Sequence, residues 1–266
     1  MTERIATTET RRAVPLPPAA WGAIGFLLLI ALWTVASWLV PGRALPSPLL
    51  IAQTMVEDGW DFYAANFSAT LARVAPGYFW GNAIAFAIAA IVLLVPALTQ
   101  VANQFGVIVD CLPITAIGPL VMIMFGGQSA AIFLSGMVVF YTSLVTALLG
   151  VHAARRSSLE LVTAYGGGKF MRLRKVQLTA ALPAVFTALK IAVPGAIIGA
   201  LVGEYLGGID VGIGVALQAA QRDILPARTF GLSIALGTLS IAGYALIGFI
   251  GRRITPWAVE TSGGMR

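Results

Sequence analysis

The chain has 266 residues, of which 58% are hydrophobic and only 11% are charged, and its mean hydropathy is +0.88. Soluble domains carry about a quarter charged residues, so the composition excludes an ordinary soluble fold and predicts a membrane protein. The net charge of +6 is interpreted as basic cytoplasmic loops and not as a nucleic-acid surface.

The N-terminal part predicts an arm, a span and a short helix. Residues 1–20 are polar and proline-rich, which predicts a disordered cytoplasmic arm. Residues 21–40 carry no charge over a length sufficient for one span. A cleaved signal peptide is the alternative, but its apolar core would be shorter, about 7–15 residues. Ser47-Pro48 is typical of a helix N-cap followed by proline at the first helical position, and a short helix should follow, ending near the acidic residues at 57–61.

The rest of the chain alternates between apolar runs and short polar segments. We expect the run at 104–125 to be broken by Pro113 and Pro119, because proline removes a helical hydrogen bond. The sequence therefore predicts an all-α polytopic membrane protein with about six transmembrane helices over 21–254 and a cytoplasmic tail at 255–266. The apolar runs after the first cover about 74–95, 104–125, 129–151, 181–206 and 229–250.

Basic residues are distributed unevenly between the loops. With the N-terminus inside and six spans, most of the 17 Lys and Arg residues fall in the arm, the 152–180 loop or the tail. This is the positive-inside pattern, and it predicts that both termini and that loop face the cytoplasm. The remaining basic residues are Arg43, Arg73, Arg222 and Arg228, assigned to the outside or the outer boundary, and Lys190, assigned to a span.

Three ionisable side chains lie within apolar runs: Asp110, Lys190 and Glu204. Charge in lipid is costly, so each is a candidate functional residue. We expect Glu204 to reach the outer membrane interface and Lys190 to extend toward the inner one. Asp110 lies just before Pro113, whose missing N–H frees a carbonyl one turn earlier. For Asp110, lining a polar pathway and pairing structurally are equally open.

No motif of an enzyme is evident. Gly166-Gly167-Gly168-Lys169 superficially resembles a phosphate-binding loop, but Phe170 stands where Ser or Thr should bind magnesium and Thr163 stands where the first glycine belongs. We therefore expect no catalytic site, no metal site and no cofactor. If transport by this chain requires ATP, another chain must hydrolyse it.

The segment 160–183 carries the most specific pattern in the sequence. Its glutamate, glycine, hydrophobic and leucine positions are spaced as in the EAA loop of type I ABC importer permeases, which the segment resembles. The resemblance implies that this loop couples the chain to a separate ATPase. Independently, three successive glycines predict a tight turn, whereas charge alone would favour an ordinary basic loop that holds anionic lipid. The coupling residues that the resemblance implies are Glu160, Ala164, Gly166, Gly167, Lys169, Val176, Leu178 and Pro183.

Other segments resemble the nitrate/sulfonate/taurine-type branch of these permeases, over roughly residues 45–255. The chain departs from the family pattern at Leu161, Val162 and Thr179, and Asp110 stands where the branch often has a basic or neutral residue. The similar segments are Leu45-Pro-Ser-Pro48, Ala69-Thr-Leu-Ala-Arg73-Val with Gly77 and Gly81, Leu112-Pro-Ile-Thr-Ala-Ile-Gly-Pro-Leu120 with Phe125-Gly126, Ala180-Ala-Leu-Pro183 and Glu204-Tyr-Leu-Gly207.

The resemblance implies an inner-membrane permease that forms the pathway for a small solute, expected to be anionic or polar. Its implied partners are ABC ATPase subunits, an extracytoplasmic solute-binding protein, a second permease subunit in a homodimer, and the lipid bilayer, with no nucleic acid. One alternative is an ion-coupled secondary transporter, which would need paired intramembrane ionisable residues and usually an internal repeat. The other is a non-transporting scaffold, which would not need the 160–183 loop.

The fifth apolar run contains a glycine stripe. Gly195, Gly199, Gly203 and Gly207 recur every four residues and so lie on nearly one face of a helix. Such a face lets another backbone approach closely. It could meet the pathway or a second subunit, with Pro194 marking a bend, or it could pack within one subunit.

Overall fold

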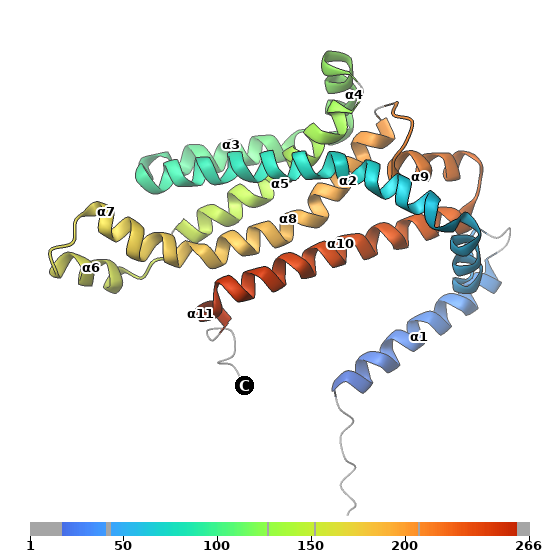
Figure 1. The fold of residues 1–266 in the computed structure, drawn as a ribbon, viewed down its shortest axis with the longest axis horizontal. Coiled ribbons are helices and arrows are strands. Elements are labelled where there is room, and N and C mark those ends of the chain that lie inside the picture. The colour runs from blue at the N-terminus through green and yellow to red at the C-terminus, as the bar shows by residue number, and fades with distance from the viewer. Residues whose placement is uncertain (1–17, 41–43, 127, 152, 207, 260–266) are drawn as a thin grey trace, which may run out of the picture.

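A computed structural model describes residues 18–40, 44–126, 128–151, 153–206 and 208–259. In this part of the chain every regular element is helical and no strand occurs (Figure 1), which confirms the predicted all-α fold. The α-helices are α1 Pro18–Leu39, α2 Pro48–Leu94, α3 Thr99–Cys111, α4 Ile114–Phe125, α5 Ser129–Val151, α6 Arg156–Ala164, α7 Lys169–Arg172, α8 Leu178–Leu206, α9 Ile213–Arg222, α10 Pro226–Ile254 and α11 Pro256–Val259. A 3₁₀ turn at Pro96–Leu98 and a π-helical turn at Leu173–Gln177 complete the described elements.

Five of the described helices, α1, α2, α5, α8 and α10, are long and apolar enough to cross a membrane. The pair α3 and α4 adds a sixth crossing when counted as one bent span. Many large apolar side chains point outward from these helices, including Trp38, Leu94 and Ile123. Lipid, not water, is the solvent in which such a surface is stable. The prediction of about six transmembrane helices is confirmed.

The start of α2 has the local structure that the sequence predicts. The Ser47 side chain accepts a hydrogen bond from the N–H of Leu50 at 3.3 Å, and Pro48 is the first helical residue. The helix is interrupted at Gly59, where φ is 77° and ψ is 163°. A β-carbon would resist this conformation, so glycine permits the interruption. The short helix expected before the acidic residues is the first part of α2.

The third apolar run breaks once, and not twice as expected. At Pro113 the chain turns by 87° between α3 and α4, with Leu112 before it in an extended conformation. Pro119 lies inside α4, so the predicted break at Pro119 is wrong. Proline disfavours helix in the preceding residue partly through a clash with its β-carbon. Gly118 precedes Pro119 and has no β-carbon, which lets the helix continue.

The centre of the bundle is α5, which packs against both α2 and α8. The contact with α2 is close because of glycine. A β-carbon on Gly77 would lie 2.6 Å from Ser135 Cβ, and one on Gly81 would lie 2.5 Å from the carbonyl oxygen of Gly136. Any side chain at these two positions would push the helices apart. The buried apolar side chains of α5 include Ala130, Ala131, Leu134, Val139 and Leu144.

Candidate functional site

The 160–183 segment begins inside α6, and this helix ends in a Schellman turn. The N–H of Gly167 donates to the carbonyl of Val162 at 2.8 Å, and the N–H of Gly166 donates to that of Thr163 at 3.0 Å. These bonds satisfy carbonyls that the helix end would otherwise leave free. Gly166 has a φ of +77°, and a β-carbon on Gly167 would lie 2.5 Å from Val162 Cγ1. The glycine turn expected from the sequence is therefore present, and the two glycines are needed for different reasons.

Beyond the turn, the segment joins the membrane-spanning part without a flexible linker. Lys169 begins α7, which passes through the π-helical turn directly into α8. Val176 is half-buried in the π-helical turn, and Leu178 and Pro183 lie in the first turns of α8. In Figure 1, α6 and α7 project beyond one end of the long helices. A displacement of α7 would therefore act directly on α8.

A hollow between α6 and α7 brings two of the expected coupling residues together. It has a volume of about 480 Å³, and its lining includes Glu160, Ala164, Arg156 and Arg172. Glu160 is exposed and carries the one acidic side chain of this segment. The two arginines give the hollow a net positive lining. Gly166, Gly167, Val176, Leu178 and Pro183 lie outside this hollow.

The same segment exposes large apolar side chains on both sides of its glycine turn. Tyr165 is 85% exposed and Phe170 is 73% exposed, with Leu161 and Met171 also more than half exposed. Exposed large apolar side chains in a loop that faces water are typical of a protein-interaction site. Tyrosine and methionine are among the residues enriched in such interfaces. This tip of the molecule thus has the surface of a docking site.

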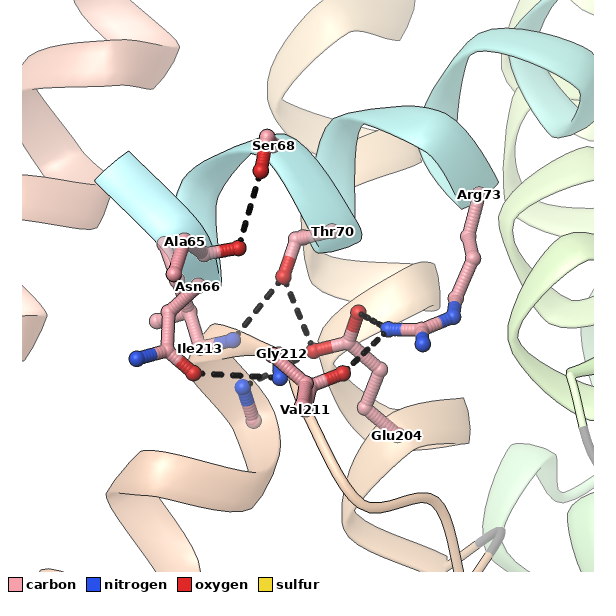
Figure 2. Close-up of polar contacts among 10 residues, drawn as sticks. Ala65, Asn66, Ser68, Thr70, Arg73, Glu204, Val211, Gly212 and Ile213 are labelled. Carbon is pink, nitrogen blue, oxygen red and sulfur yellow. Dashed lines mark hydrogen bonds and ion pairs between the residues drawn. The ribbon is translucent and has the colours of Figure 1, made fainter. Parts of the chain in front are cut away.

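A second site lies where α2 meets α8, and of its residues the sequence analysis proposed only Glu204 as functional. Arg73 Nη1 donates to Glu204 Oε1 at 2.7 Å and also to the carbonyl of Val211 at 2.8 Å. Figure 2 shows the two side chains pointing toward one another from different helices. Arg73 is 4% exposed and Glu204 is 2% exposed, so this ion pair is buried.

Further hydrogen bonds extend this ion pair to the start of α9 (Figure 2). Glu204 Oε2 accepts from the Thr70 hydroxyl at 3.0 Å and from the N–H of Gly214 at 2.9 Å. The Thr70 oxygen in turn accepts from the N–H of Ile213 at 2.9 Å, and Asn66 Oδ1 accepts from the N–H of Gly212 at 3.1 Å. Three of these bonds take up N–H groups that the first turn of α9 leaves without intrahelical partners. The network fixes α9 to α2 and α8.

The structure adds a partner to each of these residues. Glu204 does not extend into solvent, because it is buried against Arg73, and Arg73 is buried with it. An unpaired charge could snorkel, whereas two opposite charges at the same depth can neutralise each other. The sequence could have indicated this pairing, because Arg73 and Glu204 both lie at the outer ends of their apolar runs. The two runs form helices of opposite direction, so these ends are at the same side of the bundle.

The other two intramembrane ionisable residues have different surroundings. Asp110 is exposed near the C-terminus of α3, and Pro113 is exposed at the break into α4. Lys190 Nζ lies 4.8 Å from the ring centre of Tyr244 in α10, so its charge meets a neighbouring helix by a cation–π contact. No ion pair within the described residues includes Asp110, and both interpretations of this residue stay predictions.

The glycine stripe of α8 faces α5 of the same chain. A β-carbon on Gly199 would lie 2.6 Å from the carbonyl oxygen of Leu134, and one on Gly203 would meet the backbone of Ala131. Gly195 is less crowded, with Val138 Cγ1 at 3.0 Å from the corresponding β-carbon. This geometry favours packing within one subunit for the first three stripe positions. Gly207, the fourth, lies outside the described residues.

Comparison with known proteins gives one matching family and several relatives. Residues 81–256 match the family described as binding-protein-dependent transport system inner membrane component. The chain is 25% identical to the riboflavin transport system permease protein RibX of Chloroflexus aurantiacus, over 94% of this chain and 96% of that protein. It is 25% identical to the nitrate import permease protein NrtB of Leptolyngbya laminosa, over 92% and 89%. It is 24% identical to the taurine transport system permease protein TauC of Escherichia coli, over 97% of both.

Proposed function

Because this chain belongs to the binding-protein-dependent transport system inner membrane component family and is the transmembrane subunit of an ATP-binding-cassette importer for small solutes, we propose that its 160–183 segment transmits movement from the ATPase. The observation that carries this proposal is the combination of an exposed apolar tip and a rigid connection to α8. Tyr165 and Phe170 offer a docking surface, and the continuous helix from α7 onward can carry its displacement into the bundle.

The complete importer, in this proposal, contains two copies of this chain, two ATPase subunits and an extracytoplasmic solute-binding protein. The chain is a multi-pass protein of a bacterial inner membrane. We infer that both termini and the 160–183 segment face the cytoplasm, from the concentration of basic residues there. Nitrate, taurine and riboflavin, the solutes in the names of the relatives, are all candidate cargoes.

Cysteine labelling tests this orientation. In a Cys111→Ser background, a single cysteine at Gln53, exposed in the first part of α2, should react with a membrane-impermeant maleimide in right-side-out spheroplasts. A single cysteine at Ser157, exposed in α6, should react only after permeabilisation. The physical reason is the positive-inside distribution of Lys and Arg. Labelling of position 157 but not of position 53 in intact spheroplasts would reverse the assigned orientation.

Substitution of Gly166 tests coupling. Gly166→Val should lower binding-protein-stimulated uptake by at least about tenfold, because a β-branched side chain resists the left-handed φ that ends α6. The protein should still insert, since no atom of the bundle lies within 4 Å of the new β-carbon. Uptake and ATP hydrolysis would be measured on the reconstituted importer.

The matched control is Gly168→Ala. Gly168 also has nothing within 4 Å of a β-carbon, but its φ is not left-handed, so alanine should be tolerated with near-normal uptake. Equal uptake by the Gly166→Val and Gly168→Ala proteins would contradict a coupling role for the turn.

A further inference from the structure

A groove of about 440 Å³ lies where the end of α2 meets α7 and the π-helical turn. In the proposed orientation this is the cytoplasmic end of the bundle. Leu93 and Leu94 of α2 line one side of the groove, and Leu173 lies on the other side. Among the described residues that line it, only Arg172 and Gln177 have polar side chains. The groove is therefore apolar on the side of the spanning helix and positively charged on the opposite side.

The groove lies at the edge of the hydrocarbon core. Residues 74–94 of α2 are helical and carry no charged side chain. At 1.5 Å per residue this stretch is about 30 Å long, which is the thickness of a typical hydrocarbon core. Leu93 and Leu94 end the stretch, so lipid headgroups begin beside them. A water-soluble ATPase does not reach into hydrocarbon, whereas a phospholipid has both of its parts at this depth.

The positive charge in the groove has no partner in the described part of the chain. Arg172 is half-buried, and neither ion pair of the described residues includes it. The sequence contains no acidic residue between Glu160 and Glu204. Glu160 lines the neighbouring hollow together with Arg172 but forms no ion pair with it. The guanidinium therefore keeps N–H donors for an anionic group from outside the chain.

The π-helical turn brings the two polar side chains of the groove together. The N–H of Leu178 bonds to the carbonyl of Leu173, five residues earlier, so residues five apart lie nearly above one another. Arg172 and Gln177 are five apart. In an α-helix of 3.6 residues per turn they would be rotated by about 140° from each other. π-helical turns are rare and often occur at functional sites, and here the turn gives a cation and an amide the same side.

From this geometry we propose that the groove binds an anionic phospholipid, with its phosphate on Arg172 and Gln177 and one acyl chain along Leu93 and Leu94. Arginine forms charge-assisted hydrogen bonds with phosphate oxygens. The cytoplasmic leaflet is rich in anionic lipids, and basic pockets between spanning helices on this side bind their headgroups. Because Arg172 also lines the hollow between α6 and α7, the bound lipid would hold the base of the 160–183 segment at the membrane surface.

Lipid competition on the complete importer tests this site. The importer, purified in a mild detergent without ATP, would be given equal amounts of phosphatidylglycerol and phosphatidylcholine with identical chains, and native mass spectrometry would count the bound copies of each. Phosphatidylglycerol should be bound in excess. Arg172→Gln should lower the ratio of bound phosphatidylglycerol to phosphatidylcholine about tenfold, because it removes a hydrogen bond between charged groups. Since ATP is absent, the result does not depend on the coupling role of the segment.

Arg174→Gln is the matched control for this measurement. It removes the same charge from the same π-helical turn, but Arg174 is exposed and does not line the groove. The lipid ratio should stay within about twofold of the original value, as expected for an exposed charge. Equal losses in the Arg172→Gln and Arg174→Gln importers would show a diffuse attraction to a basic segment and no site. Equal binding of the two lipids by the original importer would also overturn the proposal.

A variant without a change of charge provides a second test, which holds even where Arg172→Gln fails to fold. Gln177→Leu keeps the volume but removes the amide, and the lipid ratio should fall about threefold. An unchanged ratio would contradict the headgroup position assigned to the π-helical turn. Excess inorganic phosphate should not displace phosphatidylglycerol, because phosphate lacks the chain that lies on Leu93 and Leu94. Displacement by phosphate would identify a site for a free anion and refute the lipid assignment.

Discussion

Replacing Arg73 by alanine is expected to destabilise the membrane domain by roughly 3–5 kcal/mol, because the carboxylate of Glu204 would then be buried without its counter-charge. Both side chains are almost fully buried, so water cannot replace the lost partner. The effect should be visible as a lower unfolding temperature and a lower denaturant midpoint of the purified permease in detergent. Uptake should fall as well, since α9 would lose its fixed position beside α2.

Arg222→Ala is the matched control for this variant. Arg222 is an exposed arginine at the end of α9, and its loss should change the free energy of unfolding by no more than about 0.5 kcal/mol. In a double-mutant cycle, Arg73→Leu combined with Glu204→Leu should lose less stability than the sum of the single variants, because no charge remains unpaired. Equal stability of the Arg73→Ala and Arg222→Ala proteins would show that the ion pair contributes nothing.

The parts of the fold that follow from local chemistry were predictable from the sequence. The apolar runs gave the positions of the spans, since only an uninterrupted helix satisfies its own backbone in lipid. Ser47 and Pro48 indicated the start of α2, and Pro113 indicated the break after α3. At Gly166, the glycine run indicated a turn that the structure realises with a φ of +77°. Each of these features depends on residues within a few positions of one another.

Contacts between helices that are far apart in the sequence were not predictable from one sequence. Arg73 and Glu204 are 131 residues apart, and an apolar run carries no information about its neighbour in the bundle. For the same reason, the sequence could identify the stripe that includes Gly199 and Gly203 but not its contact surface. The structure assigns that surface to α5, through the backbone of Leu134 and Ala131.

A single methyl group at Gly203 should therefore separate α8 from α5. In Gly203→Ala the new β-carbon would overlap the backbone of Ala131, and backbone cannot rotate away as a side chain can. We expect a loss of roughly 1–3 kcal/mol or more from overpacking, with transport abolished. This outweighs the gain of about 1 kcal/mol that alanine brings to a helix over glycine in a soluble protein. Unfolding of the purified permease and uptake in proteoliposomes would both be measured.

The other glycines give a graded series for the same test. Gly195→Ala should be milder, because its β-carbon would meet only Val138 Cγ1 at 3.0 Å, and a side-chain atom can shift. Gly237→Ala in α10 has nothing within 4 Å and should be neutral or slightly stabilising. Ile198→Leu, an exposed position one step off the stripe, should also be tolerated. If Gly203→Ala were as stable and as active as Gly237→Ala, close packing of α8 on α5 could not be the reason for the stripe. Its role would then have to lie in a contact between subunits, detectable as a disulfide between single cysteines on two copies of α8.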